Sequence, residues 1–349
     1  MVKATAIFAL IFIGSGVVCN EVIADNIIVT AGSNINARIN DLNKGDTVLI
    51  EAGTYENITI TNRKFTASEP LVIKAFQSDT VIISGATVTK GCSLELIGCS
   101  YIVIEGLTFL NSMWGIYVKS SDHVILRHNE ICNTGQEGVH IGRSSRYVDV
   151  IENRIHNTGK VNSKWAEGIY VGSGSYSGSG FPDNCEYVWL EGNHIYETGN
   201  AEGINIKGEN FHVTARNNKI HDIHPGTSVQ YNQAGLTVEG GANSLENGYR
   251  LKEKRDIWIE NNTIWNVKDG YSDWNNGIMF FGTGVYVINN TVYDCANRGI
   301  YGNNWKDLGL QNYVYGNNVS KCGQLIYINP ELNVSQTNPG KNPHSRQNW

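Results

Sequence analysis

The chain has 349 residues, of which 41% are hydrophobic and 17% are charged, with 38 glycines and a formal net charge of −6. An acidic balance without a basic run argues against a nucleic-acid-binding groove. After the first two dozen residues no apolar run is long enough to cross a membrane, which argues against a transmembrane protein.

The start of the chain has the pattern of a secretory signal peptide. Lys3 supplies a positive charge, an apolar stretch runs from Ala4 to Val18, and residues 22–24 offer a small-residue cleavage site. We therefore expect residues 1–24 to be a signal peptide that is removed. The mature protein is then expected to be secreted, either outside the cell or into a periplasm.

Residues 26–60 are expected to cap a repetitive domain. The apolar spacing from Ser33 to Leu42 is compatible with a helix, and a strand region then starts at Gly45 and ends near Tyr55. A solenoid needs such a cover because its first coil would otherwise expose strand edges and core.

Seven asparagines recur in one local frame, each two residues before a branched aliphatic residue: Asn129, Asn153, Asn193, Asn218, Asn262, Asn290 and Asn317. Their spacing corresponds to one coil of a β-solenoid, with two enlarged repeats. Equivalent side chains in successive coils lie about 4.8 Å apart. Stacked asparagines can therefore bond to one another and to turn backbone. The pattern predicts an all-β parallel β-helix over residues 25–334, cap included, followed by a loose tail over residues 335–349.

Two repeats are overlong, and their extra residues flank one stack of strands. The insertions span residues 160–165, 172–184, 225–233 and 242–254. Insertions gathered on one face of a solenoid usually mark its binding face. We therefore expect a groove across the sheet whose strands start near seven glycines: Gly115, Gly138, Gly168, Gly203, Gly235, Gly277 and Gly299.

Three consecutive coils carry a glutamate directly before the glycine of this strand, namely Glu137, Glu167 and Glu202. At a separation of about 5 Å and an effective dielectric of about 20, adjacent ionised carboxylates would repel by roughly 3 kcal/mol. A cation, a basic side chain or a raised pKa must offset that repulsion. Hydrogen bonds from turn amides are the alternative explanation of these residues.

The outward positions of the same sheet are predicted to stack in one row: Tyr117, His140, Tyr170, Asn205, Thr237, Met279 and Tyr301. Two residues further along each strand, Lys207 stands beside Glu239. This pair is either a surface salt bridge or part of a carbohydrate site in which Lys207 is the general base. Tyr170 and His140 would then be substrate contacts or acid/base groups, and the candidate substrate-binding residues are Asn205, Glu239, Arg143 and Arg250.

The cysteines offer two candidate disulfides. Cys295 and Cys322 occupy nearly the same frame in adjacent coils, within disulfide reach, and Cys92 and Cys99 form a second candidate pair. The other two cysteines downstream of the signal peptide are expected to be buried and free. These are Cys132 and Cys185.

The repeats, the leader and the Gly-Thr-Tyr segment at residue 53 resemble the right-handed β-helix, pectate-lyase-like superfamily over nearly the whole mature chain. The segment from Glu202 to Lys207 is similar to the active strand of the chondroitinase B and alginate lyase β-helix family. That resemblance implies a right-handed coil, Ca²⁺ bound by Glu202 and Asn200, and Lys207 as the base; Glu167 is an added candidate ligand. The Arg-His-Gly segment of that family is absent from the next coil, which leaves the acid unassigned.

These features predict a secreted polysaccharide lyase that cleaves a uronic-acid-containing polysaccharide by Ca²⁺-assisted β-elimination, acting as a monomer. Glu239 opposes this role because it raises the pKa of Lys207. Three alternatives stay open. They are a glycoside hydrolase with carboxylates paired across coils, a C5-epimerase using the same base, and a non-catalytic solenoid that binds carbohydrate or mediates adhesion.

Overall fold

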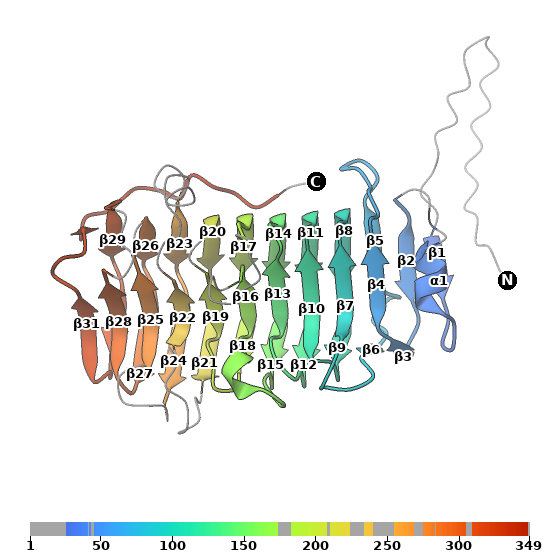
Figure 1. Cartoon of the computed structure of the whole chain (residues 1–349), viewed down its shortest axis with the longest axis horizontal. Coiled ribbons are helices and arrows are strands. Elements are labelled where there is room, and N and C mark those ends of the chain that lie inside the picture. Colours follow the sequence, from blue (N-terminus) through green and yellow to red (C-terminus); the bar gives the residue numbers. More distant parts are fainter. Residues whose placement is uncertain are drawn as a thin grey trace, which may run out of the picture.

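The computed structural model describes residues 26–40, 42, 45–173, 183–207, 210–223, 234–239, 255–268, 275–282, 284–304 and 309–347. These residues form a rod in which the chain winds through three parallel sheets (Figure 1). The expected signal peptide and Arg250 lie outside the described residues, as do most positions of the long insertions. No helix in the described part of the chain is long and apolar enough to span a bilayer.

The first sheet has twelve strands that pair in sequence order. Its strands are β1 Asn26–Val29, β2 Thr47–Ile50, β5 Leu71–Ala75, β8 Ser100–Glu105, β11 Asp122–Arg127, β14 Arg146–Ile151, β17 Glu186–Glu191, β20 Phe211–Arg216, β23 Ile257–Glu260, β26 Val285–Ile288, β29 Asn312–Tyr315 and β32 Val334–Ser335.

The second sheet has ten strands and carries the outward row expected to form the groove. Its strands are β4 Ile58–Thr61, β7 Cys92–Ile97, β10 Trp114–Lys119, β13 Val139–Gly142, β16 Ile169–Val171, β19 Ile204–Ile206, β22 Ala234–Val238, β25 Asn276–Phe281, β28 Arg298–Asn303 and β31 Gln324–Ile328.

The third sheet also has ten strands and completes each coil. Its strands are β3 Gly53–Glu56, β6 Val81–Ser84, β9 Thr108–Leu110, β12 Glu130–Cys132, β15 Arg154–His156, β18 His194–Tyr196, β21 Lys219–Ile223, β24 Thr263–Val267, β27 Thr291–Cys295 and β30 Asn318–Ser320. A short 3₁₀ helix, η1 Ser163–Trp165, lies in the first insertion.

The core runs along the inside of the rod, where aliphatic side chains from all three sheets meet. In β11, for example, Val124 and Leu126 point inward and are fully buried, whereas Ile125 belongs to a separate small cluster on the outer surface. Burying each such side chain contributes about 1.5–3 kcal/mol. The expected all-β parallel β-helix is confirmed.

The seven repeated asparagines form one continuous column between the first and third sheets, as predicted. The Nδ2 of Asn153 donates to the Oδ1 of Asn193 at 3.1 Å, and Asn193 donates to Asn218 at 3.0 Å. Each of these oxygens also accepts the backbone N–H of the preceding asparagine. The residue directly before each of these asparagines has a positive φ. At one of these positions Gly192 adopts a φ of 68° without the steric clash that a Cβ would cause.

The N-terminal end is covered by β1 and by the helix α1 Ile35–Asn40. The helix begins within the region expected from its apolar spacing, and its Ile35 and Ile39 are buried against the first coils. The Oδ1 of Asn34 accepts the backbone N–H of Ala37 at 2.9 Å and so satisfies one free amide of the first turn.

The C-terminal tail was expected to be loose, but the structure lays it back along the outer face of the first sheet (Figure 1). Asn342 donates to the Thr214 hydroxyl at 3.0 Å, and the backbone N–H of Gln347 donates to Asp149 at 3.3 Å. Sequence patterning missed this because the contacts are made by isolated polar residues of no fixed period.

Both expected disulfides are absent, because Cys92, Cys99, Cys295 and Cys322 are all free thiols. Cys99 points inward and contacts the carbonyl of Ile60, which directs it away from a partner in its own coil. Cys295 and Cys322 are stacked neighbours, as expected. Their thiols are joined by a hydrogen bond and not by the expected disulfide.

Candidate active site

The outward row of the second sheet has the predicted register. Tyr117 pairs with His140, His140 with Tyr170, Tyr170 with Asn205, and Asn205 with Thr237. Although these side chains point away from the core, His140 and Asn205 are only 8% and 2% exposed. Polar groups on this face are therefore held largely out of water, where their charges interact strongly.

Lys207 follows β19 and lies on this outer side of the sheet. Its Nζ is 2.5 Å from Oε1 of Glu239 on the next coil and 4.9 Å from the ring centroid of Tyr170 on the previous coil. Burial opposes the charge of this lysine, but Glu239 and Tyr170 together with the nearby carboxyls raise its pKa well above the ordinary value. Lys207 is therefore an ammonium in the resting structure.

Glu137, Glu167 and Glu202 lie at the entry to three successive strands, close enough to interact with the charge of Lys207, and each is at most 5% exposed. Burial raises the pKa of Glu137 to about 7 and, with the neighbouring carboxyl, raises the pKa values of Glu167 and Glu202 to about 8. The predicted repulsion is thus met in part by protonation and in part by the charge of Lys207.

His140 lies between two tyrosines of the row. Its ring stacks on Tyr117 at 4.1 Å and meets the edge of Tyr170 at 4.7 Å, while Nε2 lies 3.1 Å from the carbonyl oxygen of Gly172. Burial lowers the pKa of His140 to about 4, so the imidazole is neutral near pH 7. Its Nδ1 lies 3.8 Å from Glu137.

Asp183 belongs to this site but was not a sequence candidate. Its Oδ1 accepts the backbone N–H of Ser144 at 2.7 Å, and its Oδ2 accepts the Ser173 hydroxyl at 2.5 Å. Burial and the charge of Asp183 raise the pKa of Tyr117 to about 12. Asp183 lies in the second insertion, which has no repeat, so its position gave no signal in the sequence.

Arg255 is a second residue that sequence reasoning did not place in the site. It is 4% exposed, and one of its amino groups donates to the backbone oxygen of Glu239. Among the described residues, the Nε and Nη1 atoms have no hydrogen-bond partner, and burial lowers the pKa of Arg255 to about 10. A buried guanidinium with two free donor groups is suited to receive a carboxylate.

The remaining predicted residues divide between the centre and the edge of the site. Asn205 stacks beside Tyr170, and its buried Oδ1 has no hydrogen-bond partner. Asn200 lies in the turn that leads to Glu202. Arg143 is exposed at the end of β13, and its side chain reaches the Tyr117 phenol. The structure therefore places Tyr170, His140, Asn205, Lys207 and Glu239 along one face of the sheet, with Arg143 at its edge.

A near copy of the Lys207 pair lies on the same sheet, closer to the N-terminus. Lys119 is bonded to Glu95 on the preceding coil and lies 4.0 Å from the ring centroid of Tyr117. The Lys119 side chain is 24% exposed, compared with 13% for Lys207. A lysine paired with a glutamate near a tyrosine is thus not distinctive by itself. The adjacent buried carboxyls and Arg255 set Lys207 apart.

The donor atoms present fit the expected Ca²⁺ site only in part. Among the described residues, the three stacked glutamates do not bring one oxygen each within 4.8 Å of one another. The stack as a whole therefore does not fit one ion. The predicted set of Glu167, Glu202 and Asn200 does offer oxygen donors from two adjacent coils. Oε2 of Glu167 is buried without a hydrogen-bond partner, which fits a cation ligand.

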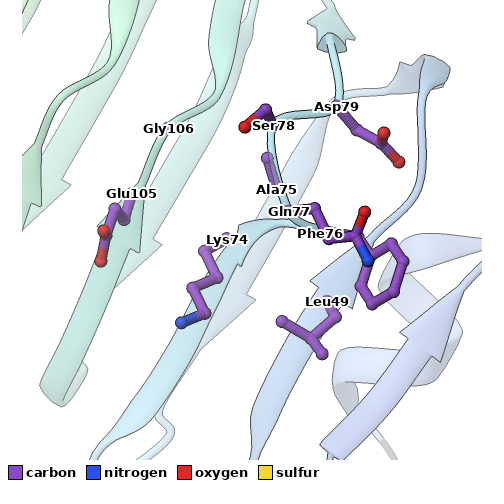
Figure 2. A pocket seen from close by; sticks show the side chains of 9 residues that line it. All are labelled: Leu49, Lys74, Ala75, Phe76, Gln77, Ser78, Asp79, Glu105 and Gly106. Carbon is purple, nitrogen blue, oxygen red and sulfur yellow. The ribbon is translucent and has the colours of Figure 1, made fainter.

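A separate hollow lies between β2, β5 and β8 near the N-terminal end (Figure 2). Both of its acidic lining residues are already engaged: Glu105 accepts two hydrogen bonds from Arg127, and Asp79 accepts the backbone N–H of Ala52. It is several coils from Lys207 and brings no additional group to the candidate site.

Comparison with known families identifies the architecture. The chain matches the model of the right-handed β-helix region over residues 92–248 and 202–339, which together cover most of its length. The chain belongs to this right-handed β-helix family. Among curated proteins, none matches the chain.

Several solved structures share the fold of this β-helix protein. An alginate lyase from Paenibacillus sp. str. FPU-7 is 22% identical with a TM-score of 0.67, over 89% of this chain and 98% of that one. The pectate lyase Pel9A is 15% identical with a TM-score of 0.61, over 92% and 82%. A periplasmic alginate epimerase is 12% identical with a TM-score of 0.51, over 90% and 85%. At these identities the likeness establishes the fold alone.

Proposed function

We propose that this β-helix protein is a secreted polysaccharide lyase that cleaves a uronic-acid-containing polysaccharide by β-elimination. The observation that carries the proposal is the ion pair of Lys207 with Glu239, with Tyr170 beside the ammonium and with Arg255, just before the first-sheet strand β23, donating to the backbone oxygen of Glu239. The fold shared with an alginate lyase and a pectate lyase is consistent with a uronan as the substrate class.

β-Elimination needs one group that neutralises the uronate carboxylate, one that removes the C5 proton, and one that protonates the departing O4 oxygen. Arg255 has free donors that can bind the carboxylate. Lys207 is the base, and the phenol of Tyr170, 4.9 Å from the ammonium measured at its ring centroid, is the acid. Lys207 must first lose its proton, which requires that its ion pair with Glu239 be weakened.

A cation would assist in the same place. Glu167, Glu202 and Asn200 are the residues that would hold Ca²⁺, which when bound supplies positive charge beside the substrate carboxylate. Positive charge near Lys207 also lowers the pKa of its amine, because it opposes the effect of Glu239. Glu167 and Glu202 would hold Ca²⁺ as ionised carboxylates, whereas without Ca²⁺ they carry protons.

The glycosidase alternative is less well supported by the protonation of the Glu167 and Glu202 pair. A retaining hydrolase needs one ionised carboxylate as nucleophile beside a protonated one. Glu167 and Glu202 both have pKa values of about 8 and are therefore both largely protonated near neutrality. An epimerase would use the same base as the lyase and differ in returning a proton to C5 rather than breaking the glycosidic bond.

The direct test is to incubate the protein with alginate, pectate, glucuronan and chondroitin, with added Ca²⁺ or with a chelator. A lyase produces an unsaturated sugar that is seen by ultraviolet absorbance, whereas a hydrolase produces only reducing ends. An epimerase changes the NMR spectrum of the polymer without shortening it. Absence of unsaturated product with every uronan, in both conditions, would refute the proposal.

Arg255 offers a second test that separates binding from folding. Removing the Arg255 guanidinium relieves the cost of burying two donor groups without partners, at the loss of one hydrogen bond to Glu239. We therefore expect Arg255→Met to unfold at the same or a higher temperature than the wild type, yet to show a raised KM for the uronan. Loss of stability with unchanged KM would assign Arg255 to the fold.

A further inference from the structure

A column of stacked rings follows the outer face of the first sheet and ends at His212. Successive ring centroids are 4.2, 4.8, 4.8 and 4.7 Å apart. The members are all in the left-handed φ region, at one repeated position of the coil: Tyr101, His123, Tyr147, Tyr187 and His212. The repeated backbone geometry is thus a property of the coil and is not special to His212.

The next coil places an acid where another ring would stack. Val213 pairs with Ile257, so Asp256 occupies the position equivalent to His212, one coil further along. The aromatic column therefore ends in a histidine followed by a carboxylate. Neighbouring coils bring these two side chains close together.

The C-terminal tail adds a third group at this point. Nε2 of His344 lies 2.7 Å from Oδ2 of Asp256, and the ring of His344 lies 4.8 Å from the ring of His212. One ligand atom from each of His212, Asp256 and His344 falls within 4.8 Å of the other two. The three residues come from two coils and from a tail segment 88 residues beyond Asp256.

We propose that His212, Asp256 and His344 bind Zn²⁺. Two imidazoles and one carboxylate are a donor set that zinc accepts, with water completing a tetrahedron. Ca²⁺ prefers six to eight oxygen ligands and is poorly served by imidazole. The inference concerns the tail and the first sheet, and it stands apart from the proposed lyase activity on the second sheet.

The surroundings hold the donors in place, as the outer shell of a metal site does. The indole N–H of Trp258 donates to the other oxygen of Asp256. Tyr187 stacks on His212 with an interplanar angle of 16° and fixes the ring. Asn342, two residues before His344, anchors the tail to Thr214. Both the coil side and the tail side of the site are therefore positioned without the metal.

A second cluster on the third sheet is a weaker candidate and serves as a comparison. Glu130, Cys132 and His156 also lie within 4.8 Å of one another. However, Glu130 is bonded to Arg154 at 2.7 Å. Burial, with Glu130, raises the pKa of the Cys132 thiol, which disfavours the thiolate that binds a metal. In the tail cluster, by contrast, the described contacts of Asp256 include the indole of Trp258 and His344.

The test uses the full mature chain without a histidine tag, dialysed against EDTA and then titrated with Zn²⁺ in a calorimeter. We expect one ion per chain, and we expect His344→Ala and His212→Ala to weaken its affinity by more than about 100-fold. Trp258→Phe should weaken it by roughly 10–100-fold, the range found for outer-shell partners. His123→Ala, in the same column, and Cys132→Ala are the matched controls and should bind normally.

Two further readouts guard against misfolding. Circular dichroism should be unchanged in the His344→Ala chain, and Zn²⁺ should protect the tail of the wild type, but not of this variant, from proteolysis. Failure of the wild type to bind Zn²⁺ would overturn the proposal. So would equal affinity in the wild type, His344→Ala and His212→Ala chains. Loss of binding in the Cys132→Ala chain would assign the ion to the other cluster.

Discussion

The ammonium of Lys207 lies 2.5 Å from the carboxylate of Glu239, on the adjacent coil. This ion pair opposes the role of general base proposed for Lys207, since an ion-paired amine keeps its proton. The same carboxylate leaves Lys207 positioned beside Tyr170, with little freedom to turn away. Glu239 is thus expected to position the base at the cost of a higher pKa.

Replacement of Lys207 should remove activity. General base catalysis contributes about 10²–10⁴-fold, so Lys207→Ala should lower kcat on the preferred uronan by that factor. Lys207→Arg should be equally inactive because a guanidinium does not give up its proton. Lys119→Ala is the matched control, as it removes the corresponding pair with Glu95. Full turnover by the Lys207→Ala chain would remove this residue from the mechanism.

Replacement of Glu239 should move the pH profile. Glu239 raises the pKa of Lys207, so Glu239→Gln should lower that pKa and let the amine deprotonate at lower pH. The rising limb of kcat/KM against pH is then expected to shift toward acid in the variant. If the rising limb does not move, then that limb does not report the deprotonation of Lys207.

Removal of the Tyr170 hydroxyl tests the proposed acid. Tyr170→Phe keeps the ring beside Lys207 but has no proton to give to the leaving oxygen, and kcat should fall by about 10²-fold or more. Tyr301→Phe changes a residue of the same outward row, where the hydroxyl accepts a hydrogen bond from Asn303. This control should keep wild-type kcat. Equal kcat values for the two variants would contradict the assignment.

The stacked glutamates should make stability depend on pH. Their folded pKa values of about 7 to 8 exceed the unfolded value of about 4.3. The protonated forms therefore stabilise the fold fully below about pH 4, and this contribution is lost as pH rises through about 8. The unfolding temperature should fall over this interval, and less steeply in Glu167→Gln.

The matched control for this titration is Glu152→Gln, which changes a glutamate whose side chain is 60% exposed. It should follow the wild-type curve. If Ca²⁺ binds Glu167 and Glu202, adding it at pH 8 should recover part of the lost stability of the wild type. Identical pH slopes for the wild type and Glu167→Gln would contradict the raised pKa.

Substitutions in the asparagine column should lower the free energy of unfolding most at the centre of the column. Asn193→Ala leaves the amide of Asn153, its backbone N–H and the carbonyl of Val150 without their partner. Each buried unsatisfied group costs about 1–3 kcal/mol, so the free energy of unfolding should fall by roughly 3 kcal/mol or more. Asn317→Ala, in the last member of the column, should cost less. Denaturant unfolding of both variants checks the order.

The repeat made much of this structure predictable. The asparagine frame fixed the coil, and the alternation within each strand gave the outward row from Tyr117 to Tyr301 in the observed register. Periodic features of this kind are visible because every coil repeats the same steric and hydrogen-bonding demands. Strict alternation places Lys207 on the outer side but would turn Glu202 inward, so the register alone did not bring these two residues together.

Features without a period were not predictable. Asp183 lies in an insertion, and His344 reaches Asp256 from 88 residues away, so neither position is tied to the repeat. Burial of the outward row also escaped prediction, because alternation alone assigns those side chains to the surface. The extent to which burial raises the pKa of Glu167 could consequently be seen only in three dimensions.

The asparagine column also has a direction. From Asn129 to Asn290 each side-chain amide of the column donates to the next asparagine toward the C-terminus, so the amide dipoles add head to tail along the rod. Each bond polarises the next, as in any hydrogen-bonded chain of one sense. A substitution inside the column would divide it into two shorter series of aligned dipoles, each with a weaker total dipole. Exchanging coils between such proteins should succeed only where the donor end of one series meets the acceptor end of the next.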